Sequence, residues 1–240
     1  MLRADSIAAG LGKGPGFVAL EAPEFRSLVG ESALADWGTF SRSWDHLEID
    51  EYMADGGRFR RRRFARFLAT LGVISRQPDG PHFQSRDYNP LNGGIDRWFE
   101  PVTDAMAAHP ITRRLLELCV EVFTKAAAVD SARTAWKIEM HQFRIEPSPG
   151  EVGRPTPEGM HRDGVDWVFV GLVARTGVAG GVTGIGDGSG RSLGAFTLSE
   201  PLDAVFLDDH RVRHGVTPIE ILTPGSPAHR DVLVLTFRKA

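Results

Sequence analysis

The sequence predicts a mainly β fold with flanking helices (α+β), built around an antiparallel sandwich or barrel. Two observations indicate this fold. After about residue 136, short β-rich runs alternate with glycine turns and no helical pattern intervenes, which is typical of antiparallel sheets. Before that point the pattern is mixed and includes one clear amphipathic helix. We expect a single domain over residues 1–240, with residues 1–135 as a mixed helical and strand buttress and residues 136–240 as the β core.

The first part of the chain contains one short strand and two segments with helical spacing. Phe17–Leu20 follows a Gly/Pro-rich opening and is predicted to be a strand. The clearest helix begins at Pro110, since proline is favoured in the first helical turn. Its apolar stripe repeats at three and four residues and comprises Ile111, Leu115, Leu118, Cys119, Val122 and Phe123. The other segment has apolar residues at helical spacing and is expected to bury one face, formed by Phe64, Phe67, Leu68 and Leu71.

The second part of the chain consists of short strands separated by turn residues. A Pro/Gly-rich loop spans Pro147–Gly159, and Gly180-Gly181 forms a turn. The strands expected around them cover residues 136–145, 167–174, 182–185, 195–198, 203–207 and 232–237.

Composition restricts the class of protein. The chain has 28 Lys and Arg residues against 31 Asp and Glu residues, a formal charge of −3, so a surface that binds polyanions over the whole molecule is not expected. Its single cysteine, Cys119, lies in an apolar string and is expected to be core packing in a reducing compartment. Apolar runs fall short of the ~18 residues that span a bilayer, and the N-terminus lacks the apolar core of a signal peptide. We expect a cytoplasmic protein without membrane association. The oligomeric state stays open, a homo-oligomer included.

An arginine run at residues 58–66 holds six arginines with interleaved aromatics. Such a run is found in nucleic-acid patches. Acidic residues just upstream are available as partners, and the aromatics fit a packed face under arginine stems, so we expect salt-bridged structure and no nucleic-acid partner. The acidic residues are Glu48, Asp50, Glu51 and Asp55.

A metal site is predicted in the second part of the chain. His161 and Asp163 are two positions apart, so on extended backbone their side chains point to the same side. His214 lies 51 residues beyond Asp163 and would supply a third ligand. Two histidines and one carboxylate leave coordination positions open and suit non-haem Fe(II). His210 is the alternative third ligand, although its polar surroundings indicate a turn.

An arginine near the end of the chain is expected to face the same interior. Arg230 shares strand parity with Val232 and Val234, which are predicted to point inward. A guanidinium at the mouth of an apolar barrel is costly unless a carboxylate pairs with it, and its planar fork is suited to gripping a carboxylate. A carboxylate-bearing co-substrate is therefore indicated. Arg238 has the same parity and remains an alternative.

The segments that carry these candidate residues occur in a specific order along the chain. The segments are His161–Asp166, Gly180–Thr183, Leu207–Asp209, Arg213–Pro218 and Arg230–Leu233, preceded by Tyr88–Gly94 and Arg97–Pro101. Together they resemble the bacterial family of Fe(II)/2-oxoglutarate-dependent dioxygenases that includes L-isoleucine dioxygenase, a family of free amino-acid hydroxylases. The resemblance covers most of the chain from about residue 45 onward.

The resemblance implies a double-stranded β-helix core (jelly-roll, cupin-like) in which His161, Asp163 and His214 hold Fe(II) and Arg230 holds 2-oxoglutarate. It further implies that 2-oxoglutarate and O2 are consumed while an aliphatic C–H bond is hydroxylated, producing succinate and CO2. Asp163 favours hydroxylation, because related halogenases carry a small residue in place of the carboxylate. No catalytic residue beyond the metal centre is expected.

The substrate implied by the resemblance is a free L-amino acid or a similar small molecule. A zwitterion needs a cation for its carboxylate, with Arg144 or Arg97 as candidates, and an acceptor for its ammonium group, with Asp166 or Glu139 as candidates. Gln142, which shares strand parity with Arg144, and the aromatics Trp167 and Phe169 are further candidates for the pocket wall.

Two alternatives to a free amino-acid hydroxylase remain. A hydroxylase of the same fold could act on a peptide or protein side chain, with the loop at residues 147–157 leaving a groove. A non-catalytic, stress-related binding protein could keep the barrel without turnover. The presence of all three predicted metal ligands together with Arg230 argues against the second alternative, because a binding-only barrel has no need for them.

Overall fold

A computed structural model describes residues 3–240. The predicted fold class is confirmed, since the chain is mostly strand and every pairing between strands is antiparallel. An eight-stranded sheet has the order β1-β10-β6-β13-β5-β3-β2, with β4 beside β3. Its strands are β1 (Phe17–Leu20), β2 (Glu48–Ile49), β3 (Arg60–Thr70), β4 (Val73–Arg76), β5 (Trp136–Ile145), β6 (Trp167–Thr176), β10 (Ala204–Asp208) and β13 (His229–Lys239).

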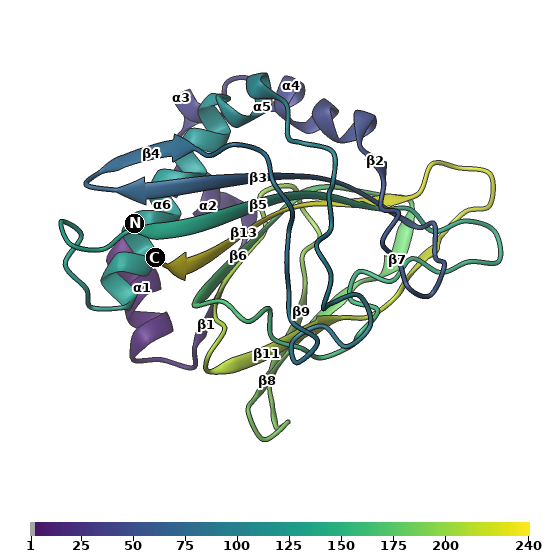
Figure 1. Ribbon diagram of the computed structural model, residues 1–240. Helices are drawn as coiled ribbons and strands as arrows, with labels where there is room; N and C mark the ends of the chain where they lie inside the picture. The colour runs from purple at the N-terminus through teal and green to yellow at the C-terminus, as the bar shows by residue number, and fades with distance from the viewer. Residues whose placement is uncertain (1–2) are drawn as a thin grey trace.

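Two smaller sheets complete the β structure. A three-stranded sheet has the order β11-β8-β9, and β12 pairs with β7. Figure 1 shows the three-stranded sheet on one side of the large sheet and the helices on the other. These strands are β7 (Val178–Gly180), β8 (Val182–Asp187), β9 (Ser192–Thr197), β11 (Val212–Val216) and β12 (Ile219–Ile221).

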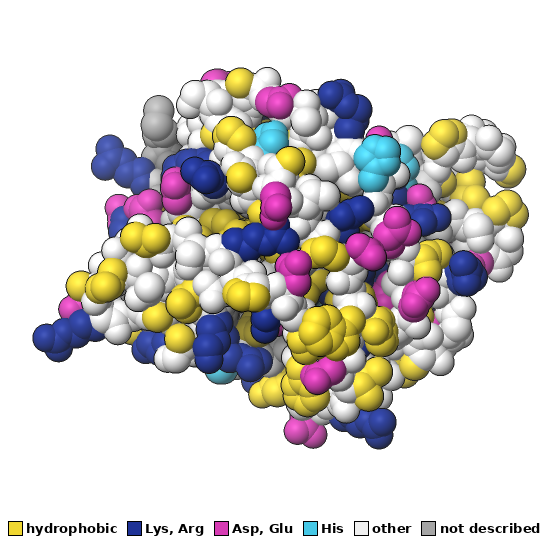
Figure 2. Space-filling view, turned by 45° about the horizontal axis from the view of Figure 1, so that its top comes forward, with side chains coloured by type: hydrophobic (Ala, Val, Ile, Leu, Met, Phe, Trp, Pro, Cys, Tyr) yellow, Lys and Arg dark blue, Asp and Glu magenta, His cyan; other side chains and the backbone are white. Residues whose placement is uncertain are grey.

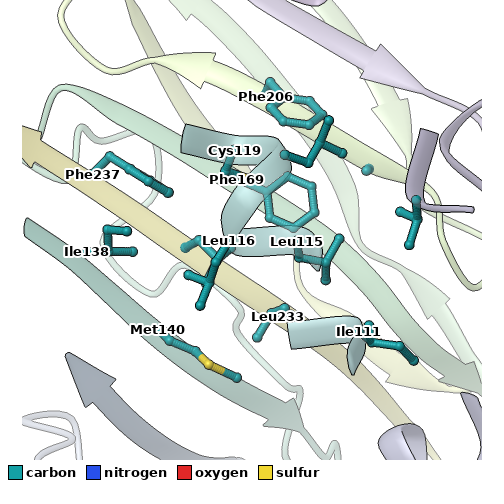
Figure 3. Close-up of a cluster of buried hydrophobic side chains, with 14 of the residues drawn as sticks. Ile111, Leu115, Leu116, Cys119, Ile138, Met140, Phe169, Phe206, Leu233 and Phe237 are labelled. Atoms are coloured by element: carbon teal, nitrogen blue, oxygen red, sulfur yellow. The ribbon is translucent and has the colours of Figure 1, made fainter. Parts of the chain in front are cut away.

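The helices cover the outer face of the large sheet. The longest, α6 (Pro110–Ala126), begins at the predicted proline, and His109 Nδ1 caps it by accepting a hydrogen bond from the Ile111 amide at 3.3 Å. Figure 3 shows its apolar side chains packed against β5, β6, β10 and β13, and Cys119 is fully buried among them. The remaining helices are α1 (Ala4–Gly12), α2 (Ala22–Val29), α3 (Glu31–Leu34), α4 (Trp37–Arg42), a 3-10 turn η1 (Ser43–His46) and α5 (Asp104–Ala107).

Strand β13 shows how the large sheet separates two interiors. Leu233 and Phe237 point into the helix-side core, whereas Val232 and Val234 point to the opposite face and line a cavity between the sheets. The cavity also reaches Thr183 on β8 and His214 on β11. Any functional group placed on the inner face of the large sheet therefore points toward the small sheet.

The structure differs from the expected division of the chain. Strands β1, β2, β3 and β4 come from the first part and pair with strands of the second, so residues 1–135 complete the large sheet as well as buttress it. The helical spacing around Phe64 was misleading, because these residues form β3. Phe64 faces the cavity-side aromatics and Phe67 faces the helix-side core. The buried positions of β3 alternate, but they change face between Phe64 and Ala65 and include Arg60 and Arg62, so its apolar residues show no clear period of two.

The arginine run lies mainly on β3, and its side chains have internal partners. Arg60 and Arg61 pair with Asp50 and Glu146, each at 2.7 Å. Arg63 donates to carbonyls of Pro101 and His46, and Arg66 donates to that of Pro78. On the face shown in Figure 2, basic and acidic side chains are interspersed. Within residues 3–240, no helix is long and apolar enough to cross a membrane.

Candidate metal centre and substrate cavity

The three predicted ligands meet in the cavity. His161 and His214 form a two-residue β-bridge through reciprocal backbone hydrogen bonds of 2.9 and 3.0 Å, and Asp163 follows two residues after the first. Asp163 Oδ1 lies 3.6 Å from His161 Nε2, and Asp163 Oδ2 lies 3.5 Å from His214 Nε2. One atom from each residue lies within 4.8 Å of the other two. This geometry suits a cation at the point where the three side chains converge.

The orientation of His161 is set by the loop before it. Its Nδ1 lies 3.0 Å from the Gly159 carbonyl, which can only accept a hydrogen bond, so Nδ1 carries the proton and Nε2 offers its lone pair. Burial alone would lower the pKa of His161, but the hydrogen bond and charge of Asp163, together with Glu158, raise it to about 9. Burial and the nearby His161 lower the pKa of His214 to about 4.

The backbone around Asp163 is held by a carboxylate that the sequence analysis did not assign. Asp209 accepts hydrogen bonds from the amides of Asp163, Gly164 and Val165 at 2.9, 2.8 and 3.1 Å. Burial, and repulsion from Asp163, raise the pKa of Asp209 to about 6. Asp209 belongs to the turn after β10, and a buried acidic pair at a strand end is the sequence signal that could have identified it.

His210, the alternative third ligand, lies away from the centre. Its Nε2 is 2.8 Å from Asp166 Oδ1, and its ring is largely exposed. Residues 209–210 form the polar turn that the sequence indicates, whereas His214 lies within β11. The geometry therefore favours His214.

Arg230 extends into the same cavity without a partner. It is buried, lines the cavity, and its Nε has no hydrogen-bond partner among residues 3–240. Burial, and repulsion from the adjacent Arg175, lower the pKa of Arg230 to about 10, and Asp231 opposes this shift. A buried guanidinium that lacks a counter-charge is strongly favoured to bind an anion.

Arg238 differs from Arg230 in both exposure and bonding. Its side chain donates to the Gly164 carbonyl at 2.5 Å, and the residue is exposed. Although both arginines touch the cavity, Arg230 is the one with free donors inside it.

The predicted positions of Gln142 and Arg144 are wrong. The two residues do share a face of β5, but that face points toward the helices. Gln142 donates to Ser43 Oγ at 2.9 Å, and Arg144 forms a two-pronged ion pair with Asp231 at 2.8 and 2.7 Å. Neither residue lines the cavity, because the odd-numbered residues of β5 point there instead.

The predictions for Asp166, Trp167 and Phe169 are also wrong in position. Asp166 bonds to His210 and to the Lys239 amide outside the cavity. Trp167 stacks on Phe123 of α6, and Phe169 lies in the same helix-side core. The residues of β6 that reach the cavity are the alternate ones, Val168 and Val170.

Arg97 and Glu139 do line the cavity, at its polar end. Arg97 is almost fully buried, and within residues 3–240 its side chain makes one hydrogen bond, to Gln84, which is long at 3.5 Å. Burial and repulsion from Arg60 lower the pKa of Arg97, while Asp50, Glu139 and Glu158 oppose this.

Two histidines that were not predicted from the sequence, His82 and His141, also line the polar end of the cavity. His82 lies 3.0 Å from Glu139, and His141 Nδ1 lies 2.7 Å from Arg62 Nη2. Because arginine only donates, His141 Nδ1 accepts and Nε2 carries the proton, directed at Glu139 at 3.9 Å. The ligand atoms of His82, Glu139 and His141 also lie within 4.8 Å of one another, but a proton on His141 Nε2 leaves that nitrogen without a lone pair for a metal ion. The odd-residue face of β5 was the signal that could have identified His141.

The donor set defines what the centre can hold. Two imidazoles and one carboxylate on one side of an ion leave open positions for other ligands, the arrangement of non-haem Fe(II) oxygenases. The orphaned Arg230 in the same cavity fits a co-substrate with a carboxylate. The residues present thus fit Fe(II) together with an anionic co-substrate.

Comparison with known proteins agrees with this chemistry. The family model of the 2OG-Fe dioxygenases matches residues 41–236. The chain is 27% identical to an L-isoleucine-4-hydroxylase of Bacillus thuringiensis, over 80% of this chain and 78% of that protein. It is 26% identical to a 3(1)-hydroxy-L-isoleucine 4-dioxygenase of Pantoea ananatis, over 87% and 83% of the two chains.

A solved structure extends the match to nearly the whole chain. A bsmA homologue from Methylobium petroleophilum PM1 superposes with a TM-score of 0.87 and 40% identity, over 99% of this chain and 93% of that one. The facing antiparallel sheets and this match confirm the predicted jelly-roll core. Because the family model covers most of the sequence, this protein belongs to the 2OG-Fe dioxygenase family.

Proposed function

We propose that this protein hydroxylates an aliphatic C–H bond of a free L-amino acid or a similar small molecule, with Fe(II) as cofactor and 2-oxoglutarate and O2 as co-substrates. Succinate and CO2 are the other products. The observation that carries the proposal is the two-histidine, one-carboxylate cluster beside a buried, unpaired Arg230 in one cavity. The family supports the cofactor and co-substrates.

His161, Asp163 and His214 hold the iron in this proposal. When bound, Fe(II) supplies the activation of O2 that couples decarboxylation of 2-oxoglutarate to hydroxylation. Arg230 orients 2-oxoglutarate by binding one of its carboxylates. Aliphatic side chains from the large sheet, among them Val168, Val232 and Val234, line the cavity. This apolar wall keeps bulk water from the reacting atoms.

The substrate class rests on the relatives and on the charges at the polar end. Both curated relatives are named for the hydroxylation of isoleucine or of a hydroxylated isoleucine. Arg97 supports an amino-acid substrate here, because it is a buried cation with a nearly free guanidinium. We assign it to the substrate carboxylate.

The proposal is tested by turnover. The protein, purified without oxygen, is given Fe(II), 2-oxoglutarate and each proteinogenic amino acid, then exposed to O2. We expect succinate release and a product one oxygen atom heavier for at least one aliphatic amino acid. His161→Ala and Asp163→Ala should abolish both signals while keeping the native circular dichroism. Unchanged turnover in either variant would contradict the assigned centre.

A further inference from the structure

Glu158 is an acidic residue with a largely buried side chain beside the proposed metal centre, and it has no role so far. Its side chain is 10% exposed and lines the cavity, and its Oε1 lies 3.4 Å from His161 Nε2. Its Oε2 is buried and has no hydrogen-bond partner among residues 3–240. A buried carboxylate without a partner is costly, so its persistence in a cavity points to a cationic ligand.

The turn that carries Glu158 is fixed to the same strand as the metal ligand His214. Thr156 Oγ1 donates to the Val216 carbonyl at 3.2 Å and also lies 2.9 Å from the Val216 amide, which donates to it. The Gly159 amide closes the turn on the Thr156 carbonyl at 2.9 Å. Gly159 in turn orients His161 through its carbonyl. Glu158 is therefore held in a defined place relative to the centre.

The neighbours of Glu158 leave it free once a metal is bound. Within residues 3–240, its one ion-pair contact is with His161 Nε2, the atom that we assign to iron. Glu158 also lies outside the group of ligand atoms that come within 4.8 Å of one another, so it stands at the side of the centre and not within it. Metal binding would take away its one contact and leave a negative charge facing the substrate space.

The other carboxylate at this end already has a hydrogen-bond partner and is more exposed. Glu139 lies 3.0 Å from His82 Nδ1, and its side chain is 29% exposed. Of the two, Glu158 is the one with a buried oxygen that has no hydrogen-bond partner among residues 3–240. Arg97, which feels the charge of Glu158, supplies a buried cation nearby.

We infer that Glu158 binds the ammonium group of the substrate, opposite the carboxylate-binding Arg97, and so selects α-amino acids over uncharged analogues. This inference rests on the proposed amino-acid hydroxylase function. It makes Glu158 the determinant of specificity for the amino group, a role that the sequence analysis gave to Asp166 or Glu139.

The test compares two substrates in three proteins. The substrates are the amino acid that gives the highest succinate release and the carboxylic acid of the same carbon skeleton that lacks the amino group. The wild type, Glu158→Gln and Glu139→Gln are assayed for kcat/KM on each. Glutamine keeps the shape and removes the charge. We expect wild type to prefer the amino acid, and Glu158→Gln to reduce that preference by about 30-fold or more, the effect of losing one partner of a buried charge pair. The KM for 2-oxoglutarate should stay within about two-fold of wild type, since Arg230 is untouched.

Three results would overturn the assignment. One is an unchanged preference in Glu158→Gln, and another is a larger loss in Glu139→Gln. The third is weakened binding of Fe(II) to Glu158→Gln in an anaerobic titration, which would make Glu158 a metal ligand. If the wild type acts on no free amino acid, the proposed function itself fails. If it acts on an amino acid but its preference does not depend on Glu158, only the present inference fails.

Discussion

At the scale of single residues, the position of Asp163 depends on Asp209. Three consecutive amides, those of residues 163–165, donate to the Asp209 carboxylate, so each of its oxygens accepts a hydrogen bond from at least one N–H group. A carboxamide would place an NH2 group against at least one amide, and the loop would shift. Groups that orient metal ligands in this way contribute strongly to metal affinity.

We therefore predict that Asp209→Asn weakens Fe(II) binding by about 10- to 100-fold although the three ligands are intact. The measurement is an anaerobic titration with Fe(II) or Co(II). Asp208→Asn is the matched control, because the Asp208 carboxylate accepts a hydrogen bond from the His210 amide and none from the amides of residues 163–165. Equal effects of the two substitutions would show that the turn as a whole, and not Asp209, sets the affinity.

Arg230 and Arg238 give a second comparison at this scale. Arg230→Gln should raise the KM for 2-oxoglutarate by about 30-fold or more, because a buried charge-assisted contact is lost. Arg238→Gln should change it far less, since that side chain is exposed and bound to the Gly164 carbonyl. Steady-state assays at saturating amino acid separate the two. The reverse order would move the co-substrate site to Arg238.

At the scale of elements, β2 and β3 are joined by a buried ion pair. Asp50, directly after β2, lies 2.7 Å from Arg60 and 3.5 Å from Arg62, and its side chain is 0% exposed. Removal of the negative charge leaves two buried guanidinium groups without compensation. We predict that Asp50→Asn lowers the free energy of unfolding by about 3–5 kcal/mol, measured by urea denaturation. Asp79→Asn, which breaks an exposed pair with Arg76, should cost about 0–1 kcal/mol.

The same pair predicts a dependence of stability on pH. Burial would raise the pKa of Asp50, but Arg60 and Arg62 lower it below the ordinary value of 3.8. A depressed aspartate pKa stabilises the folded state above pH 3.8, and this contribution disappears as the pH falls through the folded-state pKa. The difference in the free energy of unfolding between wild type and Asp50→Asn should therefore become smaller as the pH is lowered below 3.8.

The strands show which parts of the fold a sequence can reveal. Strand β5 was predicted at its observed bounds, and β1 likewise, because glycine, proline and β-rich runs mark strand ends locally. Parity correctly grouped Gln142 with Arg144, yet it cannot say which face of a strand meets the cavity. That depends on where the helices pack, which is a long-range property. Strand β3 was missed because its buried positions change face between Phe64 and Ala65 and include Arg60 and Arg62, which hides the alternation of apolar residues.

At the scale of the whole molecule, the proposed metal centre joins residues 53 positions apart through the bridge of His161 and His214. Their residue types and order were visible in the sequence, whereas the contact itself depends on the pairing of distant strands. Glu158, Asp209 and His141 have no spacing relation to the triad, so only the folded chain brings them to the cavity.

The buried thiol offers a probe of global unfolding. Cys119 is 0% exposed in the core between α6 and the large sheet, and burial raises its thiol pKa well above the ordinary value. Only an exposed thiolate can attack a disulfide reagent, so we predict negligible labelling of the folded protein and complete labelling in urea. Labelling across a urea series should follow the loss of circular dichroism. Reaction at a lower urea concentration would indicate that α6 detaches before the sheet unfolds.

The position of β13 has a consequence for how this protein is made. Strand β13 follows β5 and β6 in the sequence but lies between them in the large sheet, and it carries Arg230. During synthesis β5 and β6 emerge before their common neighbour, so they can pair with it only after β13 has been made. Until then the cavity lacks one wall and Arg230, the residue that we propose for the co-substrate.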